Sequence, residues 1–212
     1  MIKIGLDFAF KTCGIAVIGN KSLTYDSYDI SSKKINVFDA QQLMINWIWE
    51  YIQPFIVVEH ELIIEDVFSG INPKATINAA RTQGGLIDRY VQKVNKHPKL
   101  VMAASARKYV GVSARLQKAE LQLWVIDKLK LAEIPNSVRS QVVSLPIQFE
   151  RDKQKFLSQN KVGGTGRKKI LKKLFFERKK LYNKSMGQLS TEIAKLTTIN
   201  EHVADAVILA MQ

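Results

Sequence analysis

The sequence has very little cysteine and no long apolar run. Cys13 is the only cysteine among 212 residues, so an intrachain disulfide or a zinc site built from cysteines is impossible. No segment approaches the roughly 18 consecutive apolar residues of a membrane span, and the first residues lack the basic-then-apolar pattern of a signal peptide. We therefore expect a cytoplasmic protein without a membrane segment.

Acidic residues are few relative to basic ones. There are 32 Lys and Arg against 19 Asp and Glu, a formal net charge of +13. Such an excess favours a polyanionic partner, either nucleic acid or an anionic membrane surface. Residues 147–187 hold 13 basic and 3 acidic residues and so account for +10 of the total. The basicity is therefore local, and we predict a basic insertion at 147–187 within a single domain of residues 1–212.

The insertion has a glycine-rich centre at residues 163–166, which predicts a turn between two basic helical arms. The glycines do not match the GxxxxGK[ST] phosphate loop. Concentrated Lys and Arg release counterions when they neutralise DNA phosphates, so we interpret the segment as a phosphate-binding element. A solvated surface loop is the alternative, and its aromatic residues could stack on bases or pack the helices together. The candidate DNA contacts here are Arg167, Lys168, Lys169, Lys172 and Lys173.

Apolar patterning predicts an α/β fold. Residues 2–8, 12–18 and 23–30 are typical of an antiparallel three-strand meander. Further patterns predict a buried strand at 62–67, another strand at 100–103 and helices at 39–52, 72–95, 116–129 and 203–211. The 62–67 strand is apolar on both sides of Glu65, as in a central strand covered on both faces. We expect a mixed sheet, meander plus parallel strands, flanked by helices.

Three carboxylates lie on or beside apolar segments, where a charge is costly unless a cation compensates it. They are Asp7, Glu65 and Asp205. The predicted elements can bring them to one edge of the sheet, where they would repel one another unless metal binds. Oxygen ligands suit Mg²⁺ or Mn²⁺, and two such ions about 3.5–4 Å apart could support in-line displacement at a phosphodiester.

The segments around these carboxylates resemble the RuvC family of Holliday-junction resolvases, which have a ribonuclease H-like fold. Ile-Lys-Ile-Gly-Leu-Asp, residues 2–7, is similar to the first-strand motif of that family. Ile-Glu-Asp-Val-Phe at 64–68 resembles its Ile-Glu-x-Val-Phe segment, and His-Val-Ala-Asp-Ala at 202–206 resembles its C-terminal segment. The resemblance, over about residues 2–19, 62–130 and 200–211, implies that Asp7, Glu65 and Asp205 are catalytic metal ligands. His202 would take the fourth position, as a ligand or as an acid or base.

The resemblance also implies partners and DNA contacts. The expected substrate is branched DNA, chiefly four-way junctions, cut to leave a 5′-phosphate and a 3′-hydroxyl. The family forms homodimers through a helix that corresponds to residues 73–94. Phe68 matches an aromatic that enters the junction, and basic candidates beside the active site are Arg107, Lys108, Arg115 and Lys118.

The chain also departs from the family pattern. Phe8 and Ala9 stand where the family has Pro-Gly, and only the later Gly14 is retained. In its long insertion the chain resembles virus-encoded members of the family, and a lactococcal bacteriophage is one candidate source. A phage origin would place the protein in the host-cell cytoplasm. The sequence gives no indication of a helicase partner.

Three other interpretations stay open. A broad debranching nuclease would have little junction selectivity, and a non-catalytic protein would bind branched DNA by its structure. An actin-like phosphotransferase also begins with an aspartate-bearing strand, but the chain has no second copy of such a domain.

A metal site at Glu59-His60-Glu61 is unfavourable because neighbouring side chains of a strand face opposite ways.

Overall fold

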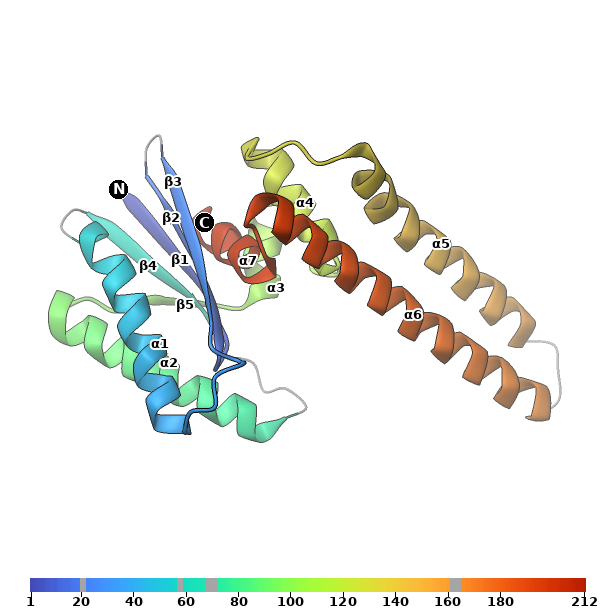
Figure 1. Cartoon of the computed structure of the whole chain (residues 1–212), viewed down its shortest axis with the longest axis horizontal. Helices are drawn as coiled ribbons and strands as arrows, with labels where there is room; N and C mark the ends of the chain where they lie inside the picture. The colour runs from blue at the N-terminus through green and yellow to red at the C-terminus, as the bar shows by residue number, and fades with distance from the viewer. Residues whose placement is uncertain (20–21, 57–58, 68–71, 161–164) are drawn as a thin grey trace. The chain divides into compact units, whose positions relative to one another are not determined.

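The structure, a computed structural model, describes residues 1–19, 22–56, 59–67, 72–160 and 165–212, without the side chains of 159, 160, 165–168 and 171. The chain forms two compact units, residues 1–116 with 200–212 and residues 117–199 (Figure 1). The predicted insertion at 147–187 lies inside the second unit. The single domain of residues 1–212 stays a prediction.

The first unit contains a five-stranded mixed sheet in the order β3-β2-β1-β4-β5. β1 (Ile2–Phe8), β2 (Thr12–Ile18) and β3 (Leu23–Asp29) form an antiparallel meander. β4 (His60–Glu65) runs parallel to β1, and β5 (Lys99–Val101) runs parallel to β4. The mixed sheet predicted from the sequence is thereby confirmed.

Helices cover both faces of this sheet. α1 (Val37–Ile52), followed by the short 3₁₀ helix η1 (Gln53–Phe55), and α2 (Pro73–Val94) lie on one side, while α7 (Glu201–Ala210) lies on the other (Figure 1). Because side chains alternate along a strand, Ile4 and Leu6 enter the apolar core with Met44 of α1, and Gly5 faces α7. The main core therefore lies on the α1 side.

Several predicted boundaries were wrong. The central strand predicted at 62–67 is β4, His60–Glu65. The sequence pattern extends β5 to Ala103, but the strand ends at Val101, and Ala103 opens the unpredicted helix α3 (Ala103–Tyr109). The C-terminal helix begins at Glu201, two residues earlier than predicted, because the Asn200 side chain accepts a hydrogen bond from the Val203 amide and caps it.

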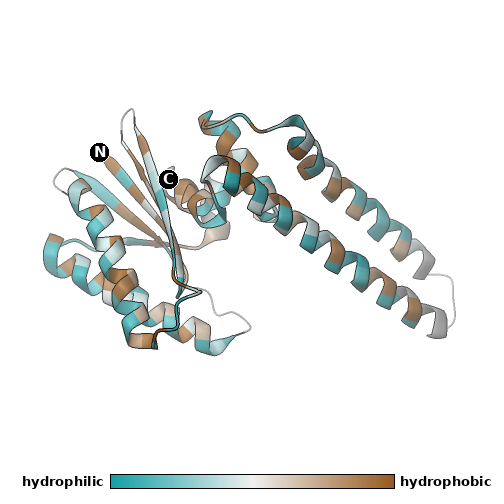
Figure 2. Cartoon of the chain, in the orientation of Figure 1, coloured by the Kyte–Doolittle hydropathy of each residue, from teal (hydrophilic) through white to brown (hydrophobic). Residues whose placement is uncertain are grey.

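The second unit is helical. It contains α4 (Lys118–Leu129), α5 (Asn136–Asn160) and α6 (Thr165–Thr197). Phe149 of α5 stacks on Tyr182 of α6 at 4.4 Å, and Phe156 stacks on Phe175 at 4.7 Å, so α5 and α6 run antiparallel as a helical hairpin. Hydrophilic and hydrophobic residues alternate along both helices of the hairpin (Figure 2).

In the described ranges no helix is both long and apolar enough to cross a membrane.

The backbone of α7 approaches the sheet at two glycines. A Cβ atom at Gly5 of β1 would overlap the carbonyl oxygen of Ala206, and one at Gly14 of β2 would overlap the carbonyl group of His202. Only glycine leaves room at these positions, because the obstacle is backbone and cannot rotate away. The two glycines therefore set how closely α7 lies on β1 and β2.

We expect Gly14→Ala to lower the free energy of unfolding by at least about 2 kcal/mol, because the added methyl forces α7 away from β2. Gly84→Ala in α2 is a matched control, since a Cβ there meets nothing within 4 Å. That control should be neutral or stabilising by up to about 1 kcal/mol. Urea unfolding followed by circular dichroism measures both, and equal midpoints for the two variants would show that the close approach is unimportant.

Candidate active site

Asp7 and Glu65 lie at the same end of neighbouring parallel strands. Leu6 of β1 pairs with Ile64 of β4, so the residues that follow them in each strand are also neighbours. In parallel strands with this register the two side chains project from the same face, the face that α7 covers. The β1–β2 connection forms without Pro-Gly: the Ala9 amide donates to the Thr12 carbonyl at 2.9 Å, and no residue of the turn has a positive φ.

The helix α7 supplies two further polar side chains. His202 and Asp205 are three residues apart, so they lie on the same face of the helix. The Asn200 cap also donates from its side chain to the Ser27 hydroxyl at 2.8 Å, which ties the start of α7 to β3. The structure thus brings together all four residues predicted for the active site.

Asp7 and His202 form a short contact. The Nδ1 atom of His202 lies 2.6 Å from Oδ2 of Asp7, and Asp7 is only 8% exposed. An ionised carboxylate can only accept hydrogen bonds, so Nδ1 carries the proton and donates it. The other ring nitrogen, Nε2, lies 3.7 Å from the Glu201 carboxylate.

Asp7 and Glu65 share a hydrogen bond, and their acidities differ strongly. Burial opposes ionisation of Asp7, but hydrogen bonds from His202 and Glu65 and the charges of His202 and Arg107 outweigh it and lower its pKa. Burial, the hydrogen bond to Asp7 and the charges of Asp7 and Asp205 raise the pKa of Glu65 to about 10. At neutral pH Glu65 therefore keeps a proton and donates it to Asp7.

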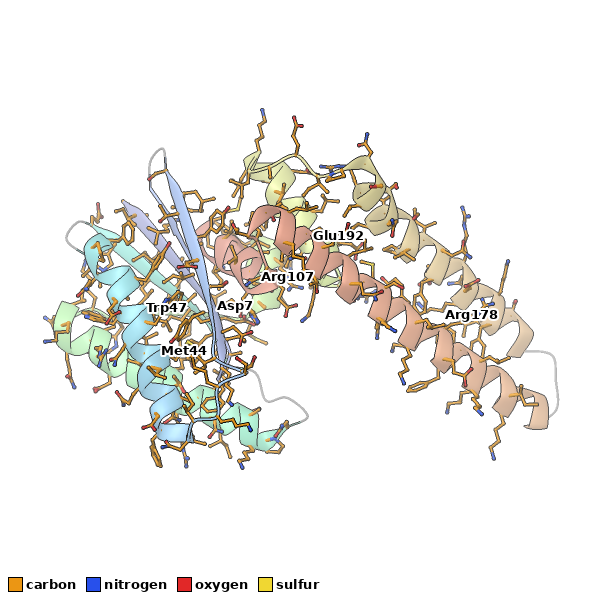
Figure 3. All side chains as sticks on the ribbon, viewed as in Figure 1. Asp7, Met44, Trp47, Arg107, Arg178 and Glu192 are labelled. Atoms are coloured by element: carbon orange, nitrogen blue, oxygen red, sulfur yellow. The ribbon has the colours of Figure 1, made fainter. Side chains whose placement is uncertain are left out.

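Asp205 is paired with Arg107 of α3; Figure 3 labels Arg107 and Asp7. The guanidinium donates to both carboxylate oxygens at 2.8–3.0 Å, and both side chains are 17% exposed. Burial and the charge of Asp7 raise the pKa of Asp205 to about 6, against the lowering influence of Arg107. Sequence reasoning proposed Arg107 only as a DNA contact; its pairing with Asp205 depends on α3, which that reasoning missed.

Gln83 of α2 is a second residue that sequence reasoning missed. Its side-chain amide donates to the backbone carbonyl of Glu65 at 2.7 Å, and the next amide, that of Asp66, donates to the Val101 carbonyl at 3.0 Å. These bonds fix the end of β4 from two sides. No sequence signal distinguished Gln83 from the other polar residues of its helix.

The donor set of the site fits a hard divalent cation. Within the described ranges no group of three or more His, Cys, Asp and Glu side chains is already arranged to hold a metal ion. The carboxylates instead form hydrogen bonds with one another, with His202 and with Arg107. Burial first, and then the neighbouring carboxylates, raise the pKa values of Glu65 and Asp205, and a divalent cation beside them would favour their ionised forms. Asp7, Glu65 and Asp205, with His202, are the residues that could hold such an ion.

The predicted DNA-contact residues lie in different surroundings. Arg107 is occupied by Asp205, whereas Lys108, Arg115 and Lys118 are exposed. Lys169, Lys172 and Lys173 are exposed on α6. The side chains of Arg167 and Lys168, and Phe68 altogether, lie outside what the structure describes.

The predicted dimer helix, residues 73–94, exists as α2. Part of its small-residue surface packs within the chain, because Ala79 is buried and Gly85 lies against Ile45 of α1. Ala80 and Gly84 on the same helix are exposed. The surface is thus divided between internal packing and solvent, and the dimer stays a prediction.

The segment Glu59-His60-Glu61 has a structural role. His60 is buried, and its Nε2 atom lies 2.9 Å from the Tyr90 hydroxyl. Glu61 lies 4.0 Å from the ammonium group of Lys99. These contacts give His60 and Glu61 structural partners.

Comparison with known proteins identifies the fold. No protein-family model and no curated protein matches the sequence. A solved structure of Thermus thermophilus RuvC in complex with Holliday junction substrate is similar, with a TM-score of 0.51 and 14% identity, over 64% of this chain and 82% of that one. Another T. thermophilus RuvC structure has a TM-score of 0.48 and 15% identity, over 64% of this chain and 84% of that one. The chain therefore has the ribonuclease H-like fold of the RuvC structures, and the predicted resemblance is confirmed at the level of the fold.

Glu65→Gln should stabilise the metal-free protein at alkaline pH. The pKa of Glu65, about 10, lies above its ordinary 4.5, so the folded protein keeps a proton that the unfolded chain releases. The free energy of unfolding therefore falls as pH rises from 4.5 toward 10, and a neutral Gln removes this loss. We expect a gain of about 1 kcal/mol or more at pH 8, and none at pH 4, in urea unfolding with a chelator. An unchanged pH slope in the variant would refute the shared proton.

Arg107→Ala should lower the free energy of unfolding by about 1–3 kcal/mol at pH 8, because it leaves the Asp205 carboxylate half-buried and unpaired. The loss should shrink at pH 5, where Asp205 takes a proton. Arg139→Ala is the matched control: Arg139 binds Asp127 at 2.6 and 2.8 Å in the same two-point manner but at an exposed position. It should cost less than about 1 kcal/mol. Equal losses for the two variants, or no pH dependence for Arg107→Ala, would contradict the assignment.

Proposed function

We propose that this protein is a divalent-metal-dependent endonuclease that resolves four-way DNA junctions by paired nicks. One observation carries the proposal: Asp7, Glu65, His202 and Asp205 come from three distant segments, and in this fold they meet at the end of β1 and β4 under α7. Each belongs to a segment that resembles a RuvC motif. A similar fold in a RuvC structure bound to a Holliday junction substrate supports the choice of DNA.

The carboxylates and the imidazole would hold Mg²⁺ or Mn²⁺, with two ions per active site. Such ions would neutralise the negative charge of the scissile phosphate and lower the pKa of the attacking water. Among the protein groups, Asp7 and Asp205 are ionised at neutral pH, whereas Glu65 becomes an anionic ligand only when its proton leaves. The hydrogen bond from Nδ1 to Asp7 orients His202 and leaves Nε2 as the ring nitrogen that can accept a proton.

Arg107 has a second role in this proposal. Its guanidinium neutralises Asp205 before a metal does, and a planar guanidinium matches a phosphate as well as a carboxylate. If Asp205 held a metal ion, the Arg107 guanidinium would be available to bind a phosphate of the cut strand. Lys108, Arg115 and Lys118 would contact flanking phosphates.

A homodimer suits this substrate. Two symmetric nicks need two active sites, and a two-fold dimer presents them to a two-fold symmetric junction. The exposed part of α2 would form the interface. The lysine-rich hairpin would bind phosphates whatever the sequence, and this favours activity on branched DNA generally as the second candidate function.

A cleavage assay on a synthetic four-way junction with Mg²⁺ tests the proposal. Asp7→Asn and Glu65→Gln should each slow cleavage by at least about a hundredfold, because each replaces an anionic oxygen ligand that would hold the divalent ion with a neutral amide. Asp66→Asn is the matched control, since Asp66 is an exposed carboxylate beside Glu65. It should cut like the wild type.

The same assay includes Y-forks, flaps and plain duplex. Preference for the four-way junction supports a resolvase, and comparable cutting of forks and flaps supports a general debranching nuclease. Cleavage by Asp7→Asn and Glu65→Gln at the wild-type rate would show that the active site has been assigned wrongly. Junction binding with no cleavage by the wild type at any Mg²⁺ or Mn²⁺ concentration would favour a non-catalytic protein.

A further inference from the structure

Phe176 on α6 is an exposed aromatic residue surrounded by lysines. Its side chain is 69% exposed. Residues three and four positions away on a helix are its surface neighbours, and all four of these are exposed lysines. They are Lys172, Lys173, Lys179 and Lys180.

Packing of the hairpin does not explain Phe176. Its neighbour in sequence, Phe175, stacks on Phe149 and Phe156 of α5, and Tyr182 stacks on Phe149. Successive residues of a helix point about 100° apart, so Phe176 leaves this aromatic core and faces solvent with the lysines. The core aromatics hold the two helices together, and Phe176 is available for a ligand.

The positive charge around Phe176 exceeds the negative charge near it. Glu150 and Asp152 are engaged by Lys153 and Arg178 at 2.9 and 2.8 Å. Glu177, the third acidic residue of 147–187, is exposed and lies four and three positions from Lys173 and Lys180, so it is a helical neighbour of two of the four lysines. None of the four lysines forms an ion pair with any residue that the structure describes. The surface therefore combines a π face with an excess of positive charge.

We propose that Phe176 and its four lysine neighbours form a binding site for unpaired nucleotides, in which the ring stacks on a base and the lysines bind the flanking phosphates. Stacking is available only to a base that has left the duplex, whereas lysines bind the phosphates of any strand. The site would thus recognise the single-stranded or opened segment of branched DNA. This inference rests on the proposed function for the identity of the polyanion.

The arrangement favours a nucleic acid over a membrane. A membrane-binding helix gathers its exposed apolar residues on one face. On α6 the exposed Ile170, Leu174 and Leu181 share one face, about 120–160° around the helix from Phe176, so the ring does not belong to that apolar face. Phe176 is therefore a single aromatic within a field of lysines, as in surfaces that bind single strands by stacking.

Binding of three DNAs by the full-length chain tests the site. An Asp7→Asn background prevents cleavage, and the DNAs are a single strand, a Y-fork and a fully paired duplex, at the same salt concentration. Phe176→Ala should weaken binding of the single strand and fork by about tenfold and of the duplex by less than twofold. Phe176→Trp should restore binding, and quenching of a 2-aminopurine base in the single-stranded arm should disappear only with Phe176→Ala.

Two controls separate stacking from charge and from simple exposure. Leu181→Ala removes an equally exposed apolar side chain, 64% exposed, from another face of α6 and should change nothing. Replacing the four lysines by Gln should weaken binding of all three DNAs and flatten its salt dependence. Unchanged single-strand affinity in Phe176→Ala, or an equal loss for duplex, would overturn the proposal.

The outcomes distinguish this site from the proposed nuclease. If the wild-type protein shows Phe176-dependent quenching but cuts no branched DNA, the nucleotide-binding site is supported and the nuclease proposal is refuted. If it cuts junctions without such quenching, the nuclease proposal is supported and the nucleotide-binding site is refuted. Phe176-dependent binding to vesicles containing phosphatidylglycerol, with no Phe176-dependent binding to DNA, would replace the proposal by a membrane contact.

Discussion

The close approach of the α7 backbone to β1 and β2 is the constraint on which the rest of the site depends. Gly5 and Gly14 leave no side chain between the sheet and the carbonyl groups of Ala206 and His202. This contact places His202 within 2.6 Å of Asp7, so the geometry of the polar site follows from the packing of a helix on a sheet. A larger residue at either glycine would push the α7 backbone away from the sheet and so separate His202 from Asp7 without changing any side chain of the site.

The polar site is a balance of burial and charge. Three carboxylates under α7 repel one another, and burial makes each charge more costly. A proton on Glu65 and the guanidinium of Arg107 relieve this repulsion. Any cation that enters must compete with both, so the same groups that stabilise the metal-free fold also limit how strongly an ion binds.

Most of the fold and the principal site residues could be predicted from the sequence because their signals are local. The meander shows strand alternation, and each carboxylate sits in a recognisable apolar context. The helix α3 could not be predicted, because seven residues give too little periodicity, and Arg107 therefore looked like one more surface cation. The bond from Gln83 to the Glu65 carbonyl depends on how α2 packs, which no local pattern encodes. The exposure of Phe176 beside the half-buried Phe175 likewise depends on which face of α6 packs against α5.

The first unit is discontinuous in sequence, and this affects how the protein is made. Residues 200–212 complete a unit that begins with residues 1–116, and the 83 residues of the second unit are translated between the two parts. The growing chain on the ribosome therefore carries β1 and β2 with one face uncovered until α7 emerges. During that interval Asp7 has neither His202 nor Asp205 beside it. The polar site is thus completed only after the whole second unit has been synthesised.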